Sequence, residues 1–253
     1  MSLTEQVRSY WEQTPCGTAD SIVGDAQPMS RAWFERIEAH RYAAEPFIHA
    51  VAQFTRHRGK RLLEIGVGAG TDHVQWARAG ALCHGVDLTQ AAIDTTRAHL
   101  AHHGLSSALQ RLSAESLPFP DASFDLVYSW GVIHHAERPE AIVKEILRVL
   151  QPGGEFIGML YARRSLVALQ FWVRFALLAG KPWRSFADVI WHHMESSGTR
   201  SYSRAELRRM FGAFGRVETL KIVTPYDTAY LPRWLAGLVP GALGWNIAVR
   251  AAK

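Results

Sequence analysis

The chain has 253 residues, of which 48% are hydrophobic and 20% are charged. This length suits one large α/β domain with its own core, whereas two full domains would be cramped. The formal net charge is +5, from 28 basic and 23 acidic side chains that are scattered rather than gathered in runs. Scattered charge is typical of a solvated surface, so we expect no nucleic-acid partner.

Two cysteines, Cys16 and Cys83, are too few for a disulfide framework. The first residues lack the basic and apolar segments of a secretion signal, so we expect a cytoplasmic protein. Cys16 has no visible activating partner, and Cys83 falls within a buried strand pattern, so neither is predicted to react or to bind a metal.

The single predicted domain begins with a helical cap over residues 1–58. A short helix comes first, a loop follows over residues 14–18, and a second helical stretch starts at Ser30 and restarts at Pro46. Residues 59–161 then alternate between strand and helix patterns. Strands are predicted near 61–65, 82–87, 108–112, 125–130 and 154–160, with helices near 71–79, 89–103 and 137–150.

Residues 162–202 interrupt this alternation with an aromatic and basic insertion. Residues 203–253 carry a C-terminal helix and the closing strands. Ser203 and Glu206 have the spacing of a capping box for a helix that ends near Phe214. Strands near 217–224 and 244–250 complete a doubly wound α/β fold.

Glycines occupy alternate positions directly after the first predicted strand, at Gly66, Gly68 and Gly70, with Glu64 just before them and Asp87 at the end of the next strand. Such a loop between a parallel strand and a helix lets a ligand approach the backbone closely. A carboxylate at the neighbouring strand end can accept hydrogen bonds from both ribose hydroxyls, worth about 1.5–3 kcal/mol each. The pattern predicts a nucleoside site.

Phosphates do not fit this loop well. Thr71 stands where a dinucleotide site has a further glycine, and no Gly-Lys-Ser or Gly-Lys-Thr follows. Glu64, at the end of the first strand, instead fits a ligand that carries positive charge.

These residues resemble the first motifs of the class I S-adenosylmethionine-dependent methyltransferases. The resemblance continues through residues 113–115, 117–127, 133–135 and 150–156. Within this family, the sequence is most similar to the large branch that includes ubiquinone and menaquinone biosynthesis methyltransferases and many enzymes of bacterial specialised metabolism. The acceptors of that branch are small molecules.

The resemblance implies a Rossmann-like fold with a seven-stranded, mostly parallel sheet whose last strand is reversed. It implies S-adenosylmethionine as cofactor, with residues 59–161 as the cofactor-binding core and residues 162–202 as a helical lid insertion. The glycine loop would run beneath the methionine part of the cofactor, and Asp87 would bind the ribose. The expected cofactor-binding residues are Glu64, Gly66, Gly68, Gly70, Asp87, Leu88, Ala114, Glu115, Ser129, Trp130 and Tyr10.

Methyl transfer from a sulfonium depends mainly on alignment, which can supply about 7–11 kcal/mol. An acceptor that must lose a proton also needs a base, and imidazole titrates in the right range. His134 and His135 follow the fourth strand, which ends at the ligand crevice of a doubly wound sheet. Adjacent side chains diverge, so we expect only one to face the acceptor, with His134 slightly preferred. A purely structural role for both is the alternative.

Acceptor selection is expected in the insertion. The expected acceptor contacts are Trp11, His134, Trp172, His192 and His193. The apolar stretch near residues 165–180 is too short to span a bilayer. It fits a lid, a core or dimer helix, or a membrane-surface helix, and we expect a monomer or homodimer without stable membrane insertion.

No metal site is predicted. His99, His102 and His103 have a spacing that could gather ligands, but imidazoles in the last turn of a helix already interact well with its negative end.

The sequence therefore predicts methyl transfer to a small, apolar or aromatic acceptor, and leaves the acceptor atom open among carbon, oxygen, nitrogen and sulfur. One alternative is a nucleic-acid methyltransferase, although residues 128–132 lack the Asn- or Asp-Pro-Pro-aromatic stretch typical of enzymes that act on exocyclic amines. The other is a cofactor-binding protein without catalysis.

Overall fold

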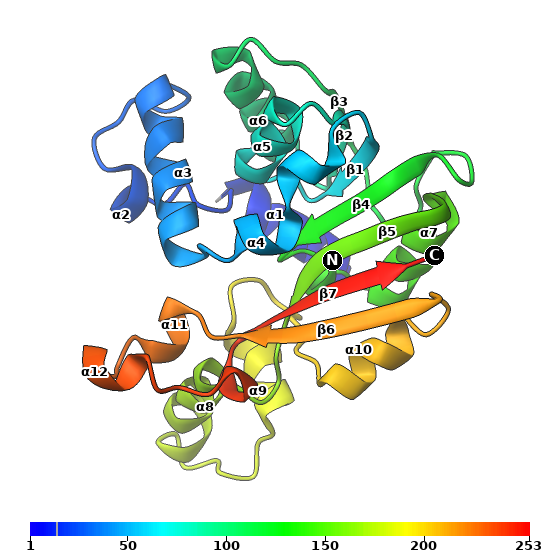
Figure 1. Ribbon diagram of the computed structural model, residues 1–253. Helices are drawn as coiled ribbons and strands as arrows, with labels where there is room; N and C mark the ends of the chain where they lie inside the picture. The colour runs from blue at the N-terminus through cyan, green and yellow to red at the C-terminus, as the bar shows by residue number, and fades with distance from the viewer. Residues whose placement is uncertain (14) are drawn as a thin grey trace.

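A computed structural model describes residues 1–13 and 15–253, so Thr14 of the predicted 14–18 loop lies outside the described residues. A seven-stranded sheet with the order β3-β2-β1-β4-β5-β7-β6 forms the centre of the molecule (Figure 1). The strands are β1 Arg61–Ile65, β2 Leu82–Asp87, β3 Ala108–Arg111, β4 Phe124–Trp130, β5 Leu150–Tyr161, β6 Arg216–Ile222 and β7 Asn246–Ala252. Strands β1 to β5 pair in parallel, and β7 runs antiparallel to both β5 and β6. The predicted doubly wound sheet with a reversed last strand is confirmed.

Helices precede and alternate with these strands. Their bounds are α1 Leu3–Gln13, α2 Asp20–Val23, α3 Arg31–Ala44, α4 Ile48–Ala52, α5 Thr71–Arg78, α6 Gln90–His102, α7 Pro139–Val149, α8 Leu166–Trp172, α9 Phe186–His193, α10 Arg204–Met210, α11 Pro225–Thr228 and α12 Arg233–Ala236. The 3-10 turns are η1 Phe54–His57, η2 Ile133–His135 and η4 Gly241–Leu243, and η3 Val173–Leu177 is a π-helix.

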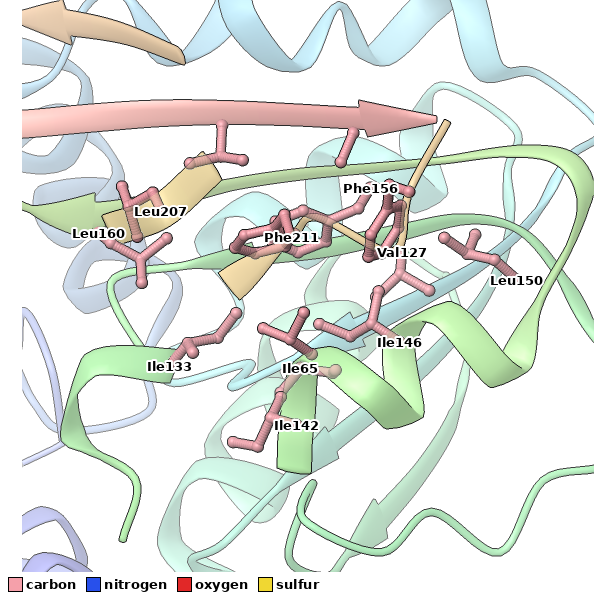
Figure 2. Packing of buried hydrophobic residues seen from close by; sticks show 14 of the residues in the cluster. Ile65, Val127, Ile133, Ile142, Ile146, Leu150, Phe156, Leu160, Leu207 and Phe211 are labelled. Atoms are coloured by element: carbon pink, nitrogen blue, oxygen red, sulfur yellow. The ribbon is translucent and has the colours of Figure 1, made fainter. Parts of the chain in front are cut away.

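Both faces of the sheet are covered, which explains why its strands read as nearly continuous apolar runs. On one face Leu63, Ile65 and Val127 pack with Ile142 and Ile146 of α7, as Figure 2 shows for the last four. On the other face a second set of residues packs together: Leu62, Leu126, Tyr128 and the fully buried Trp76 of α5. Successive residues of β1 and β4 thus point to opposite layers.

Side-chain caps set where several helices begin. Ser30 accepts a hydrogen bond from the Trp33 amide, and Ser203 and Glu206 form the predicted capping box. Helix α10 nevertheless ends at Met210 rather than near Phe214, because the chain turns there to bury Phe211 and Phe214 in the core beneath the sheet.

The apolar stretch of the insertion is not one regular helix. Helix α8 continues directly into the π-helix Val173–Leu177, and Val167 and Ala168 pack against Ile190 of α9 and Trp245. Helices α8, α9, α11 and α12 gather at one end of the sheet (Figure 1). In the part of the chain that the structure describes, no helix is both long and apolar enough to cross a membrane.

Candidate functional site

A cavity of about 830 Å³ lies at the carboxyl ends of the parallel strands, where a doubly wound sheet binds its ligands. One end of the cavity, the donor end, is built from residues that follow β1, β2, β3 and β4. Its lining includes the expected cofactor residues Glu64, Gly66, Gly68, Asp87, Leu88, Ala114, Glu115 and Trp130.

The three glycines of the loop have different roles. Gly66 and Gly70 adopt positive φ angles and lie against protein. A Cβ added to Gly66 would come within 2.2 Å of Val132, and one added to Gly70 within 3.0 Å of Thr96. At Gly68, an added Cβ would approach only the Cβ of Cys16, at 3.9 Å. Gly68 is therefore the position where bare backbone faces the cavity, whereas Gly70 caps α5 and does not line it.

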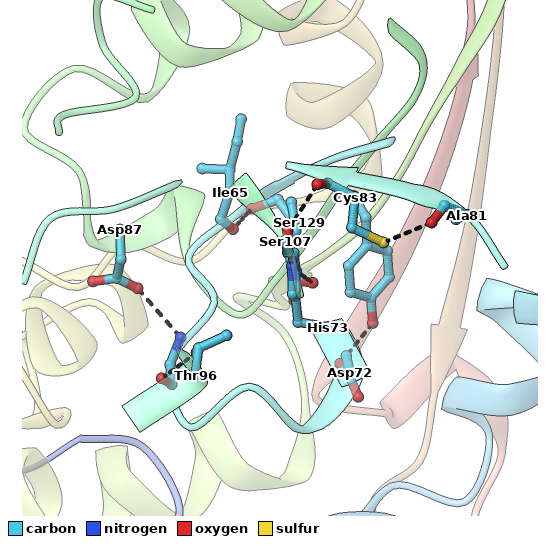
Figure 3. A network of polar contacts seen from close by, with 12 residues as sticks. Ile65, Asp72, His73, Ala81, Cys83, Asp87, Thr96, Ser107 and Ser129 are labelled. Atoms are coloured by element: carbon cyan, nitrogen blue, oxygen red, sulfur yellow. Dashed lines mark hydrogen bonds and ion pairs between the residues drawn. The ribbon is translucent and has the colours of Figure 1, made fainter. Parts of the chain in front are cut away.

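Asp87 is held in place by its own neighbours. Its Oδ1 accepts hydrogen bonds from the Thr89 amide at 2.9 Å and the Thr89 hydroxyl at 2.8 Å. Its Oδ2 accepts a longer one from the Gly68 amide at 3.3 Å, the dashed line drawn from Asp87 in Figure 3. Burial raises the pKa of Asp87 while these hydrogen bonds lower it. Oδ2, the less occupied oxygen, remains available to hydroxyl donors of a ligand.

Glu64 forms a buried pair with His73 of α5, which Figure 3 labels. The two side chains lie 2.9 Å apart, and the far ring nitrogen of His73 lies 2.8 Å from the Ser107 hydroxyl. Since Ser107 donates its hydrogen to the Cys83 carbonyl, His73 Nε2 must donate to Ser107. Burial lowers the pKa of His73 to about 4 and raises that of Glu64 well above its usual value. We therefore assign the shared proton to Glu64, which makes the pair neutral overall.

A buried ionic cluster that the sequence did not predict lies beside the donor end. Arg41 of α3 donates to Glu45 at 2.8 Å and to Asp72 at 2.7 Å. The hydroxyls of Tyr42 and Tyr128 also donate to Asp72, while the side chains of Trp130 and Asn246 donate to Glu45. Arg41, Glu45 and Asp72 all line the cavity, and two carboxylates against one guanidinium leave one negative charge, which favours a cationic ligand.

A second part of the cavity lining, which we call the acceptor end, collects residues from distant segments. Trp11 of α1, His135 of η2, Tyr161 of β5, Glu195 of the insertion and Trp245 before β7 all line it. The rings of Trp11 and His135 are 5.4 Å apart, and those of Tyr161 and Trp245 stack at 4.3 Å. The Tyr161 hydroxyl lies 3.3 Å from Glu195. This end combines aromatic walls with a small group of titratable side chains.

Two hydroxyls lie beside Nδ1 of His135, that of Ser196 at 2.9 Å and that of Thr199 at 3.0 Å. Thr199 donates its hydroxyl hydrogen to the Ser196 carbonyl at 2.8 Å, so toward Nδ1 it can only accept, whereas the Ser196 hydroxyl can accept or donate. A proton on Nδ1 satisfies the Thr199 oxygen and leaves the free lone pair on Nε2, which lies 4.0 Å from Glu195 Oε2. Burial lowers the pKa of His135 to about 3. A ligand oxygen can lie within hydrogen-bond distance of both Nε2 and Glu195 at once.

His134, the slightly preferred base, does not line the cavity. The 3-10 turn points its side chain into protein, where its ring packs 3.9 Å from that of Tyr161 and is fully buried. Within the described residues neither ring nitrogen has a hydrogen-bond partner, and burial keeps its pKa well below the usual value. The preference for His134 over His135 is therefore wrong.

Other expected contacts also point elsewhere. Ser129 donates to the Ile65 carbonyl inside the sheet, Tyr10 stacks edge-on against Trp11, Trp172 donates to the Arg184 carbonyl, and His192 bonds to the Asp188 carbonyl on the surface. None of these four lines the cavity, whereas Trp11 and His193 do. The four residues that do not line the cavity were expected there from their positions along the chain, and such positions do not give the direction of a side chain.

The three histidines of α6 do not converge on one point. His99 is buried, hydrogen-bonds to the Ala69 carbonyl at 3.0 Å and stacks on Phe34, while His102 bonds to the Met29 carbonyl. Among the residues that the structure describes, no group of three or more His, Cys, Asp or Glu side chains is arranged to hold a metal.

A parallel sheet, an open glycine in the first loop and a carboxylate on the second strand define a Rossmann-like nucleoside-binding protein. Comparisons with known proteins then specify its family. Residues 63–158 match the family described as "Methyltransferase domain". The match covers residues 63–158, and together with the similar methyltransferases it supports a class I S-adenosylmethionine-dependent methyltransferase domain, whose cofactor is S-adenosylmethionine.

Three similar proteins show the range of this likeness. The chain is 33% identical over 132 residues to 24-methylenesterol C-methyltransferase 2 of Oryza sativa subsp. japonica, covering 51% of this chain and 36% of that protein. It is 34% identical over 98 residues to a ubiquinone biosynthesis O-methyltransferase of Nitrosococcus oceani, and the match covers 38% of this chain and 42% of that protein. The matched part thus spans less than half of both curated relatives. The crystal structure of the [4+2]-cyclase SpnF is similar in fold, with a TM-score of 0.66 and 18% sequence identity. The similarity covers 99% of this chain and 96% of that structure.

Proposed function

We propose that this protein transfers a methyl group from S-adenosylmethionine to a small apolar or aromatic acceptor, with His135 as general base. The single observation that carries the proposal is the continuity of the cavity. The same 830 Å³ space is lined by Asp87 and Gly68 at one end and by His135 and Glu195 at the other. A donor and an acceptor can therefore meet inside it.

The residues of the donor end suit each part of the cofactor. Asp87 Oδ2 would accept from the ribose hydroxyls, and the open backbone of Gly68 would lie under the amino-acid tail. The net negative charge of Arg41, Glu45 and Asp72 would favour the cationic sulfonium. Bound there, S-adenosylmethionine supplies an electrophilic methyl group.

The acceptor class follows from the walls of the acceptor end. Trp11, Tyr161 and Trp245 present aromatic surface, and His135 and Glu195 are titratable groups among them. Such a lining favours an apolar or aromatic molecule that carries one ionisable group. The names of the sterol and ubiquinone-pathway relatives describe acceptors of the same general character.

His135 would remove the acceptor proton through Nε2. Its low pKa keeps the ring neutral at physiological pH, and Thr199 holds the proton on the opposite nitrogen. As the ring becomes cationic, Glu195 at 4.0 Å can stabilise the charge. Aligned deprotonation and in-line attack would then occur without large movement of the protein.

As part of the same proposal, residues 162–202 act as a lid over the acceptor, within a single domain whose cap is residues 1–58. The insertion supplies Glu195, Ser196 and Thr199, which contact the acceptor end or His135 directly. We also propose a cytoplasmic enzyme of specialised metabolism, monomeric or homodimeric, in which the free thiols of Cys16 and Cys83 stay reduced.

The direct test incubates the protein and S-adenosylmethionine with fractionated metabolite extracts and follows mass gains of one methylene unit. We expect methylated products with the wild-type protein and none with Asp87→Ala. Cofactor binding without any product would favour the non-catalytic alternative, and products only on added RNA or DNA would favour a nucleic-acid methyltransferase.

A further inference from the structure

Large apolar side chains are unusually exposed in the segment between β6 and β7. Helices α11 and α12 of this segment lie beyond the end of the sheet, close to α8 (Figure 1). We call its exposed residues the apolar rim: Tyr226 (51% exposed), Tyr230 (81%), Leu231 (37%), Trp234 (72%) and Leu238 (70%). A soluble protein seldom leaves so much neighbouring apolar surface in water without a partner.

The apolar rim borders the opening of the cavity. Tyr226 and Tyr230 line the cavity and are also exposed, so they must lie where it meets the solvent. Gln170 of α8 also lines the cavity and donates to the Asp227 carbonyl at 3.3 Å, which joins α8 to the same opening. Leu169, next to Gln170, is exposed as well. An apolar molecule that enters here would pass the apolar rim.

The start of the segment is firmly anchored. Asp227 is buried, and its Oδ2 accepts from the Thr224 amide at 2.8 Å and from the Trp245 amide at 2.9 Å. The side chains beyond it are therefore presented from a fixed base, and their exposure does not result from a missing attachment of the segment.

Positive charge lies on the insertion, whose helix α8 contacts α11. The insertion carries exposed Arg164, Arg174 and Lys181. Of its two acids, Asp188 is paired with Arg184 and Glu195 lines the cavity. The Lys221 ammonium bonds to the carbonyls of both Arg164 and Ala242, which places Arg164 beside the end of the segment.

We propose that the apolar rim docks on an anionic membrane surface, so that the cavity opens toward the lipid. Exposed Trp and Tyr beside Leu suit the boundary between headgroups and acyl chains, because these rings have one apolar and one polar side. The flanking cations match the negative potential of anionic lipids. A protein groove would explain the apolar side chains but not this basic surround, so a lipid surface is the better match.

Co-sedimentation with vesicles tests this docking, using the full chain without donor or acceptor. Vesicles of phosphatidylcholine alone are compared with vesicles that also contain phosphatidylglycerol, at low and high salt. We expect binding to the anionic vesicles that weakens with salt, and a loss of at least about tenfold in partitioning for the double variant Trp234→Ala, Leu238→Ala. Leu82→Ala removes an apolar side chain that is 57% exposed on β2, away from the apolar rim, and should bind as the wild type does.

Three results would overturn the proposal. One is wild-type protein that ignores both kinds of vesicle, and another is equal loss of binding in Leu82→Ala. The third is a concentration-dependent dimer in sedimentation velocity that the Trp234→Ala, Leu238→Ala variant abolishes, which would assign the apolar rim to a second copy of the chain. Thermal unfolding of each variant checks that it is folded. Because vesicle binding is measured without turnover, its failure would leave the proposed methyl transfer untouched.

Discussion

The two ends of the cavity are built in different ways. The donor end consists of consecutive strand ends between Glu64 and Gly131, and much of it is backbone or carboxylate held by adjacent amides. The acceptor end combines α1, η2, β5, the insertion and the chain before β7, held together by side-chain contacts such as that between His135 and Thr199. A change at the acceptor end can therefore alter acceptor selection without disturbing the sheet, whereas a change at the donor end affects every acceptor alike.

The largest expected effect is at the acceptor end. His135→Gln should lower kcat by about a hundredfold to ten-thousandfold, because the acceptor loses its base. His134→Gln is the matched control, since His134 is adjacent and buried but away from the cavity, and it should change kcat by less than about threefold. Equal losses in both variants, measured by steady-state kinetics on folded protein, would mean that the residues act through structure alone.

Loss of the ribose contact should be the largest effect at the donor end. Asp87→Ala removes two charge-assisted hydrogen bonds, and a loss of about 3 kcal/mol corresponds to more than about a hundredfold in the Kd for S-adenosylhomocysteine. Titration calorimetry measures this directly. Asp94→Ala, at a half-exposed position of α6, should bind with unchanged affinity. An unchanged Kd for Asp87→Ala would contradict the assignment of the ribose.

A smaller loss should follow from filling the open backbone position. Gly68→Ala places a methyl group in the cavity and should weaken S-adenosylhomocysteine binding by about tenfold. Its φ of 53° strains any L-residue, so Gly104→Ala, at φ 64° with open space around it, is the control for backbone strain. Both should lose about 1–2 kcal/mol of stability, and only Gly68→Ala should lose affinity.

Thr199 should have the smallest effect, because it acts through His135. Thr199→Val removes one of the two hydroxyls beside His135 Nδ1 and leaves that of Ser196 at 2.9 Å, so it should lower kcat by about threefold to fivefold with little change in KM. Thr199→Ser keeps the hydroxyl and should restore most of the rate. If Thr199→Val and Thr199→Ser have equal rates, the hydroxyl does not hold the proton of His135.

The pH dependence separates His135 from an ordinary histidine. Its pKa is lowered from 6.5 to about 3 by burial, so the ring is neutral and able to act as a base throughout the neutral range. The rate attributable to this group should stay flat through pH 6.5 and decline only as the pH falls toward about 3. A kcat profile with its midpoint near the ordinary value would identify a different, more exposed base.

The residues that the sequence assigned to the donor end mostly lie together in the cavity lining, because the signals that pointed to them are local. The strand, the alternating glycines and the acid after the next strand lie within a short stretch, and parallel pairing of β1 with β2 brings Asp87 beside Gly68. Even here the sequence treated the three glycines alike, whereas an added Cβ would meet protein at Gly66 and Gly70 and open space only at Gly68, and Gly70 does not line the cavity.

The acceptor end could not be predicted in the same way. Glu195 meets His135 only when the insertion folds back, and the Arg41, Glu45 and Asp72 cluster beside the donor end likewise forms only when α3 docks beside α5. These contacts join residues far apart in the chain, for which periodicity and spacing give no signal. The choice between His134 and His135 depended on one 3-10 turn, which rotates neighbouring side chains in different directions.

The central claim is that one cavity holds the donor at Asp87 with its reactive sulfur directed toward His135. A crystal structure with bound S-adenosylhomocysteine tests it most directly. We predict ribose hydroxyls within hydrogen-bond distance of Asp87 and the sulfur facing the space between His135 and Glu195. A ligand whose sulfur points away from His135, or whose ribose contacts a different residue, would contradict the account.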